Sequence, residues 1–192
     1  MRKEEICMHT LDIFLNRIKG AYSNRAQHTE HTSLPQAIHI TTPVNERINN
    51  LPKNFDDVFV IDETYYRYED HMMELHHLYR YHAHSDGSIA LIPYEVPSES
   101  LAQKFDRQHV QQLSYNELTV KQSFSPILYT FENDVFTSEG SSEIAPGITL
   151  HVVMKLYRDH YTVIEACYAN GTLVSGFEEP VCYERMIEQE VV

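Results

Sequence analysis

Five histidines crowd one short segment of the chain, and imidazole is a common ligand of transition metals. They are His71, His76, His77, His82 and His84. On an extended strand three of them, at positions 76, 82 and 84, share a face with Arg80, whose charge repels a cation. No carboxylate stands nearby as an obvious third ligand, and alternating polar residues are typical of the solvated face of a half-buried strand. We therefore expect no native metal site and no cofactor.

The other face of the same segment carries rings with polar tips. It holds His77, Tyr79 and Tyr81, and Tyr65 stands in the preceding strand. Such side chains suit a cavity for an amphipathic ligand, because the ring buries apolar area while the hydroxyl finds a polar partner. They equally suit a packed core in which each hydroxyl binds the backbone. The residue types leave both interpretations open.

Other signals of chemistry are weak. The sequence has no nucleophile elbow, phosphate-binding loop, dinucleotide fingerprint or HExxH motif. Cys7, Cys167 and Cys182 form no CxxC pair, and nothing near them in the sequence would lower the pKa of a thiol. This pattern fits a reducing compartment and argues against a disulfide framework.

Composition excludes several classes of function. The 192 residues carry a net charge of −13 and no cluster of Lys or Arg, so a nucleic acid would be repelled. No stretch reaches the roughly 20 apolar residues that span a bilayer, and acidic residues near the N-terminus stand where a signal peptide needs an apolar core. We expect one domain over residues 1–192, in the cytoplasm, with neither nucleic acid nor membrane as a partner.

The first part of the chain predicts one helix and little regular structure after it. Apolar residues between positions 4 and 19 recur at helical spacing and Gly20 follows them, which indicates an N-terminal amphipathic helix. Residues 21–54 are polar and broken by prolines. They indicate a loop with an edge strand at 37–41.

From Asp57 onward the hydrophobic period changes to two, as expected for strands. Short segments rich in β-branched and aromatic residues alternate with turn signals, of which Asn170–Gly171 is the strongest. Residues 98–116 have a Ser98 N-cap and indicate a short mid-chain helix. About eight short strands joined by hairpins predict a mainly β fold, an antiparallel sheet closed into a barrel.

Four short motifs run along the chain in a definite order. The helix runs into "FLNRIKGAYSNRAQ" (14–27), and "VFVIDETYY" (58–66) places Glu63 late in a strand. The segment "LYRYHAHSDGSIALIPYEVP" (78–97) joins an aromatic strand, an Asp-Gly turn and a Tyr-x-x-Pro ending, and "ANGTLVSG" (169–176) contains Gly-x-x-Val-x-Gly. In this order and spacing the sequence resembles the CpcT/CpeT-type phycobiliprotein chromophore lyases over most of its length.

The resemblance implies a lipocalin-like, or calycin, antiparallel barrel whose mouth accepts an open-chain tetrapyrrole (bilin). It implies that the ligand is bound by Tyr22, Tyr65, His77, Tyr79, Arg80 and Tyr81. The guanidinium or the imidazole would meet a carboxylate of the ligand. Glu63 would act as proton donor while the bilin is attached to a cysteine of an acceptor protein. Since neighbouring residues of a strand face opposite sides, Arg80 and His77 cannot both line the interior without a bulge.

Two functions remain open from the sequence. The first is a chromophore lyase-like protein that binds a bilin or a similar amphipathic molecule and presents it to an acceptor protein. The second is a non-enzymatic binding or protein-interaction module whose barrel is filled by side chains. A continuous pocket of several hundred cubic ångströms would favour the first, and a sealed core the second. The sequence leaves open whether the protein is an enzyme and whether it is a monomer or a homodimer.

Overall fold

The computed structural model describes residues 3–95, 106–107 and 113–187, with side chains from His9 onward. The predicted mid-chain helix at 98–116 lies mostly outside the described residues. Within its last described part, residues Tyr115–Glu117 form a single 3-10 turn (η3).

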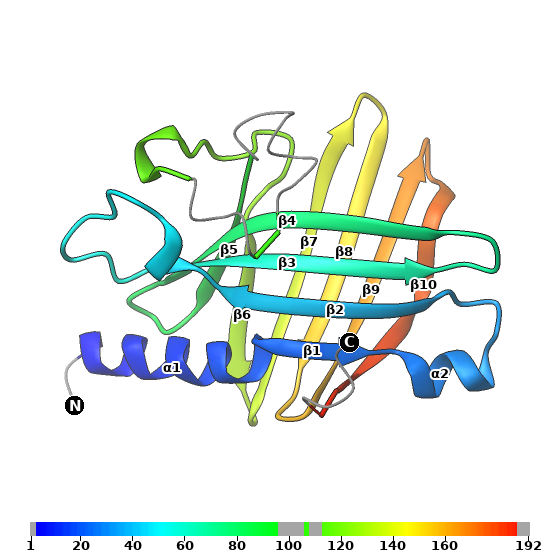
Figure 1. Cartoon of the computed structure of the whole chain (residues 1–192), viewed down its shortest axis with the longest axis horizontal. Coiled ribbons are helices and arrows are strands. Elements are labelled where there is room, and N and C mark those ends of the chain that lie inside the picture. The colour runs from blue at the N-terminus through cyan, green and yellow to red at the C-terminus, as the bar shows by residue number, and fades with distance from the viewer. Residues whose placement is uncertain (1–2, 96–105, 108–112, 188–192) are drawn as a thin grey trace.

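Ten strands form a closed antiparallel barrel, in which each strand pairs with the next in the chain and β10 closes on β1 (Figure 1). They are β1 (Gly20–Ser23), β2 (Gln36–Pro43), β3 (Val58–Arg67), β4 (Met72–Ala83), β5 (Ile89–Tyr94), β6 (Ile127–Glu132), β7 (Val135–Ala145), β8 (Ile148–Leu156), β9 (His160–Ala169) and β10 (Thr172–Arg185). The helices are α1 (Lys3–Ile18), α2 (Arg25–Glu30) and the short η1 (Asn45–Arg47). The prediction of a mainly β, antiparallel, lipocalin-like barrel with an N-terminal helix is confirmed.

The strand count differs from the prediction for two reasons. β1 is only four residues long, and β7 alternates small and polar side chains, so neither gives a strong hydrophobic period. The segment expected as an edge strand at 37–41 belongs to β2, which pairs on both sides, with β1 and with β3. Residues 118–120, whose sequence also has strand character, make only an isolated bridge between Val120 and Tyr94.

Two hairpins have the left-handed turn residues that their sequences predict. Asn170 and Gly171 have φ of 51° and 79°, and Asn133 and Asp134 have φ of 52° and 62°. Positive φ at both central residues is the geometry of a type I′ turn, whose twist matches that of the flanking strands. The register of β9 on β10 and of β6 on β7 is therefore fixed locally.

Helix α1 closes one end of the barrel. Its apolar face buries Leu11, Phe14 and Ile18 in the main core. The Phe14 ring is fully buried and lies 4.8, 4.9 and 5.1 Å, centroid to centroid, from the rings of Tyr81, Tyr129 and Phe136. Edge-to-face contacts of this kind orient the helix across the strand ends.

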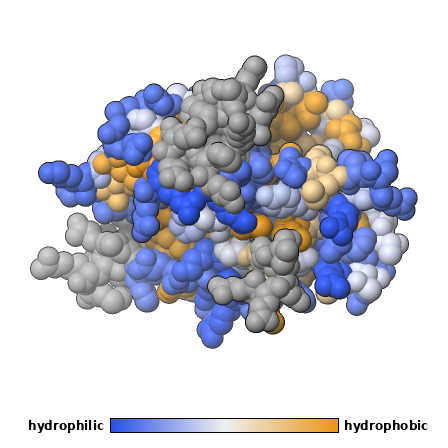
Figure 2. Space-filling view, viewed as in Figure 1, coloured by the Kyte–Doolittle hydropathy of each residue, from blue (hydrophilic) through white to orange (hydrophobic). Residues whose placement is uncertain are grey.

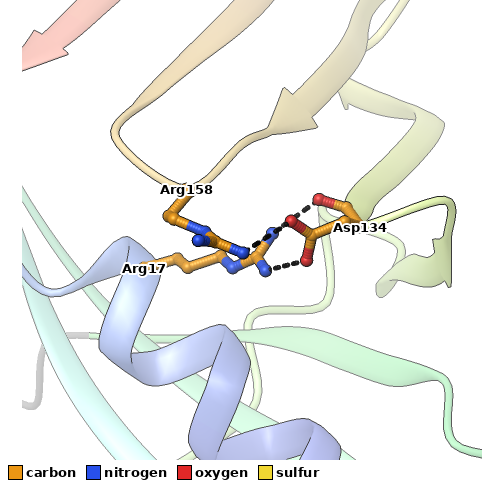
Figure 3. A network of polar contacts seen from close by, with 3 residues as sticks. All are labelled: Arg17, Asp134 and Arg158. Atoms are coloured by element: carbon orange, nitrogen blue, oxygen red, sulfur yellow. Dashed lines mark hydrogen bonds and ion pairs between the residues drawn. The ribbon is translucent and has the colours of Figure 1, made fainter.

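Charged side chains fix the C-terminal end of α1 to distant turns. Arg17 donates to the Asp134 carbonyl at 2.7 Å and pairs with its carboxylate, which also accepts from Arg158 at 3.1 Å (Figure 3). Arg185 of β10 donates to the carbonyls of Asn16, Arg17 and Lys19, the free acceptors at the end of the helix. The helix end is thus joined to three separate parts of the barrel.

Two motif residues at the start of α2, Asn24 and Gln27, connect the chain after β1 to β2 and to β10. Asn24 is buried and its side chain binds the Pro35 carbonyl and the Ala37 amide. Gln27 accepts from the Cys182 amide at 2.7 Å and donates to the Pro180 carbonyl at 3.1 Å. This glutamine satisfies backbone groups of β10 beside a register shift, which explains its place in the motif structurally.

A second apolar cluster lies outside the barrel wall. Phe59, Ile61 and Leu78 point outward from β3 and β4 and are covered by residues of the connecting segments, including Val44, Ile48 and Leu113. β3 therefore buries both faces, as its continuous run of β-branched and aromatic residues predicts.

Candidate functional site

The barrel interior contains a cavity of about 150 Å³. Its described polar lining residues come from β2, β3, β4, β6 and β9 and from the segment before β6: His39, Thr41, Asp62, Thr64, Tyr66, His77, Tyr79, Tyr81, Ser125, Tyr129, Tyr161 and Glu165. Ile18 of α1 lines the end that the helix closes, while Leu75 and Phe124 line the cavity farther from the helix. The interior is thus neither a sealed core nor a large pocket.

Two carboxyl groups face this cavity. Burial raises the pKa of Asp62 to about 6, although a hydrogen bond from Thr41 at 2.8 Å opposes the rise. Burial also raises the pKa of Glu165 to about 7, and the nearby Asp62 adds to the effect. The Glu165 side chain remains accessible to water because it lines the cavity, yet the barrel wall surrounds it. None of the described lining residues is Lys or Arg, so these acids have no basic partner there.

The two histidines of the cavity are neutral at pH 7. Burial lowers the pKa of His39 to about 3, and the neighbouring His77 adds to the shift. The pKa of His77 falls to about 4, mainly through burial and further through Lys121. Neither imidazole can therefore supply a positive charge to a ligand.

Tyrosine hydroxyls provide the donors. Burial raises the pKa of Tyr79 and of Tyr81 well above the usual value, so both stay protonated. Neither hydroxyl has a hydrogen-bond partner among the described residues. Both are therefore free to donate to, or accept from, a molecule in the cavity.

The residues expected to bind a ligand divide into two groups. His77, Tyr79 and Tyr81 line the cavity. Tyr22 belongs to the same core but lies behind Tyr161, 5.1 Å between ring centroids, and its hydroxyl binds the Arg17 carbonyl. Tyr65 lies on the outer face of the barrel. Its register partner on β4 is Glu74, and the β4 residues that face the cavity are the odd-numbered His77, Tyr79 and Tyr81. The structure therefore separates Tyr65 from the other expected wall residues.

Arg80 also lies on the outer face, as strand alternation requires when Tyr79 and Tyr81 face inward. Its Nε is 3.4 Å from a carboxylate oxygen of Asp57, and its guanidinium lies 5.5 Å from the centre of the Tyr94 ring. These contacts hold Arg80 away from the cavity, so it cannot meet the carboxylate of a ligand inside the barrel.

Glu63, the expected proton donor, points outward too. It is 1% exposed, accepts a hydrogen bond from the Tyr65 hydroxyl at 3.2 Å and lies 3.4 Å from Arg107. Its neighbour Asp62 occupies the inward position. Both faces of β3 are buried, so burial alone does not identify which of the two acids faces the cavity.

Asp62 and Glu165 were not recognised from the sequence as site residues, although a signal existed. In "VFVIDETYY" Asp62 falls on the same face as Val58, Val60 and Thr64, and in "TVIEACYA" Glu165 stands between apolar residues. A lone acid on an apolar, inward face has to be compensated or functional. Only the closed barrel shows that the two acids share one space.

The five histidines between residues 71 and 84 do not form a single cluster, although the rings of His82 and His84 lie 4.9 Å apart, centroid to centroid. His82 binds Asp57 at 2.7 Å, His71 binds Asp70 at 2.6 Å, and His77 faces the cavity. Among the residues that the structure describes, no group of three His, Cys, Asp or Glu side chains is arranged to hold a metal ion. In the same part of the chain, no helix combines the length and the apolar run that a membrane crossing needs.

Comparison with known proteins identifies the fold. No family model and no curated protein matches the sequence. Two solved structures are similar along nearly their whole length. The CRL protein of Arabidopsis has a TM-score of 0.65 and 12% identity, over 94% of this chain and 99% of that one. The T-type phycobiliprotein lyase CpeT from Prochlorococcus phage P-HM1 has a TM-score of 0.54 and 14% identity, over 92% of this chain and 97% of that one.

At these identities the likeness concerns the fold. The chain has the CpcT/CpeT-like, lipocalin-type barrel that the motif order implied, with a bilin lyase among its structural neighbours.

Proposed function

We propose that this protein binds an amphipathic, conjugated small molecule of the open-chain tetrapyrrole class in the barrel cavity and presents it to a cysteine of an acceptor protein. The observation that carries the proposal is a barrel cavity with two carboxyl groups and no described basic partner. The likeness of the fold to a phycobiliprotein lyase supports the choice of ligand class.

The polar groups of the cavity fit a ligand rich in N–H groups. Carboxylates only accept hydrogen bonds, and Asp62 and Glu165 would accept from pyrrole N–H groups with the strength of charged hydrogen bonds. Tyr79 and Tyr81 offer ring faces for the conjugated system and hydroxyls for a ring carbonyl. The propionates of a bilin would be repelled by the acids, so they would remain outside, on the side of Lys121, whose ammonium lies 4.5 Å from the centre of the Phe124 ring.

The cavity size limits how such a ligand sits. At about 150 Å³ it is smaller than the roughly 300–1,000 Å³ typical of pockets that enclose a drug-sized molecule. One end of a tetrapyrrole would therefore enter the barrel while the rest lies at the mouth. That arrangement leaves a reactive end accessible to an acceptor protein.

In a transfer step, the acids that face the cavity, Asp62 and Glu165, would donate and accept the protons. Addition of a thiol to a carbon–carbon double bond of the ligand forms one C–S bond and moves the thiol proton to the ligand. A carboxyl with a pKa near 7 can give and accept that proton at neutral pH. Glu165 fits this role better than Glu63, which lies outside the cavity.

The small volume also favours a second candidate, a binding protein for a smaller amphipathic molecule with N–H groups and no transfer step. Such a ligand would fit within the cavity as it stands. The same binding experiment separates the two candidates.

The test is an absorbance and fluorescence titration of the purified protein with phycocyanobilin and with biliverdin, using haem as a closed-ring control. We expect saturable binding of the open-chain pigments with a shifted, sharper visible band. Asp62→Asn and Glu165→Gln should each weaken binding about tenfold, the loss of a hydrogen bond to a charged group.

Glu139→Gln is the matched control, because Glu139 lies on β7 with a side chain 73% exposed and away from the cavity. Its affinity should equal that of the unmodified protein. Absence of any spectral change, or equal effects of the inward and outward replacements, would overturn the tetrapyrrole proposal. Tight binding of a compound the size of a single pyrrole ring, with none of the full pigments, would support the second candidate.

A further inference from the structure

One edge of β10 is largely unpaired by other strands. β10 has 14 residues, whereas its neighbour β1 has four, and the two pair only at Glu184 and Arg185. The Gln27 side chain occupies the next positions, at Pro180 and Cys182. From Thr172 to Glu179 no described strand lies on this edge, so β1 and β10 close the barrel only through a short seam.

Apolar side chains stand along this edge. Leu173 is 39% and Val174 56% exposed, and hydrophobic residues gather at the upper right of Figure 2, where the strands β7 to β10 end. Between α2 and β10 runs a groove of about 380 Å³, whose lining includes Leu34, Leu173, Phe177 and Pro180. An unpaired strand edge beside an apolar groove is the arrangement that accepts an extended segment by strand addition.

Charge identifies the kind of occupant. Glu178 and Glu179 line the same groove, and the whole chain carries a net charge of −13. A second copy pairing edge to edge would bring these acids against their own counterparts, which is unfavourable.

We propose that the edge of β10 from Thr172 to Glu179, with the groove beside α2, is a docking site for an extended, basic segment of a partner protein. Main-chain hydrogen bonds to the free edge would supply affinity, Leu173 and Val174 would contact apolar side chains, and Glu178 and Glu179 would pair with Lys or Arg. Phe177 is the register partner of Glu165, so a docked segment would lie next to the cavity wall. The docking site does not require that the cavity binds a bilin.

The probe is a capped peptide of about six residues that alternates lysine and valine, a length suited to a short edge. It is titrated into the ligand-free protein while amide chemical shifts and hydrogen exchange are followed. We expect the largest shifts and added protection between Thr172 and Glu179, with affinity that falls as salt is added. The same peptide with glutamate in place of lysine should not bind.

Two matched replacements locate the site. Glu178→Lys combined with Glu179→Lys should weaken peptide binding at least tenfold. Glu132→Lys combined with Glu139→Lys, on β6 and β7, changes the net charge equally and should have a smaller effect. Leu173→Ser should weaken binding, whereas Leu128→Ser, at a residue 46% exposed on β6, should not.

Three results would overturn the proposal. The first is that both charge reversals weaken peptide binding equally. The second is that the chemical-shift changes are confined to another surface. The third is that the chain dimerises, that the dimer protects the same β10 amides, and that Leu173→Ser abolishes it. The last result would assign the edge to a second copy of the chain.

Discussion

Asp62 and Glu63 are neighbours in the sequence with opposite surroundings. Asp62 faces a cavity that water enters and that holds a second acid, Glu165. Glu63 is enclosed on the outer face between Tyr65 and Arg107. The alternation of side chains along β3 therefore decides which of the two carboxyl groups can contact a molecule in the cavity. Only a carboxyl on the cavity side can do so.

The raised pKa values of the two inward acids predict a stability change with pH. In the fold Asp62 and Glu165 keep their protons up to about pH 6 and 7, whereas the ordinary values are 3.8 and 4.5. Between these limits the folded state binds more protons than the unfolded state, so the free energy of unfolding falls as pH rises. Asp62→Asn combined with Glu165→Gln should remove this loss of stability at higher pH.

Urea denaturation across the pH range measures the effect. The double variant should be more stable than the unmodified protein at pH 8 by about 1–2 kcal/mol, a value kept modest because cavity water screens Glu165. The advantage should vanish below about pH 4. His39 and His77 act in the opposite direction, losing stability as pH falls below 6.5, but they are common to both proteins. An equal difference at pH 5 and pH 8 would contradict the assignment.

At the scale of elements, β10 is the most irregular strand of the barrel. Its residue Gly176 has φ of +85°, and a Cβ there would lie 1.9 Å from the Glu165 carbonyl oxygen. The close approach of β9 and β10 at this point explains the last glycine of the Gly-x-x-Val-x-Gly motif. The same close approach holds Glu165, whose side chain lines the cavity, against β10, the strand whose other edge is largely unpaired.

Gly176→Ala is expected to destabilise the protein by about 3 kcal/mol or more, because it combines a left-handed backbone with a clash against the neighbouring strand. Gly171→Ala is the control, since Gly171 has a similar φ of +79° but nothing within 4 Å of the added carbon. That variant should lose only about 1 kcal/mol. Chemical denaturation compares the two, and equal losses would show that the approach of β9 to β10 is not the cause.

At the scale of the whole molecule, α1 and the barrel form one core. Phe14 contacts rings from three strands, and Arg17 and Arg185 join the helix end to β10 and to two turns. Two of those rings, Tyr81 and Tyr129, also line the cavity. The helix therefore closes one end of the cavity and also covers the strand ends.

Phe14→Ala should lower the free energy of unfolding by about 3–5 kcal/mol, the cost of removing a fully buried aromatic ring. Asn16→Ala, on the exposed side of the same helix, should change it by less than about 0.5 kcal/mol. Thermal denaturation monitored by the loss of β-sheet signal measures both. If Phe14→Ala unfolds at the same temperature as the control, the helix is not part of the core.

The order of the motifs along the chain and the strand pattern made the barrel predictable. The turn and alternation signals within that pattern are local. Asn170–Gly171 determines its turn because only a few residues adopt positive φ readily, and period-two alternation determines which residues share a face. The helix from Lys3 to Ile18 followed from its own apolar spacing. These features depend on interactions between residues a few positions apart, so the sequence by itself determined them.

Which face lines the cavity was decided only by the tertiary structure. β3 is buried on both sides, so burial could not show that Asp62 faces the cavity while Glu63 and Tyr65 face outward. On β4, alternation separated His77 from Arg80 but could not show which of them faces inward. The cavity brings Asp62 and Glu165 together from strands about 100 residues apart, and the closure of β10 on β1 joins Tyr22 to Arg185. Such contacts have no local signal, because they exist only after the sheet has curved and closed.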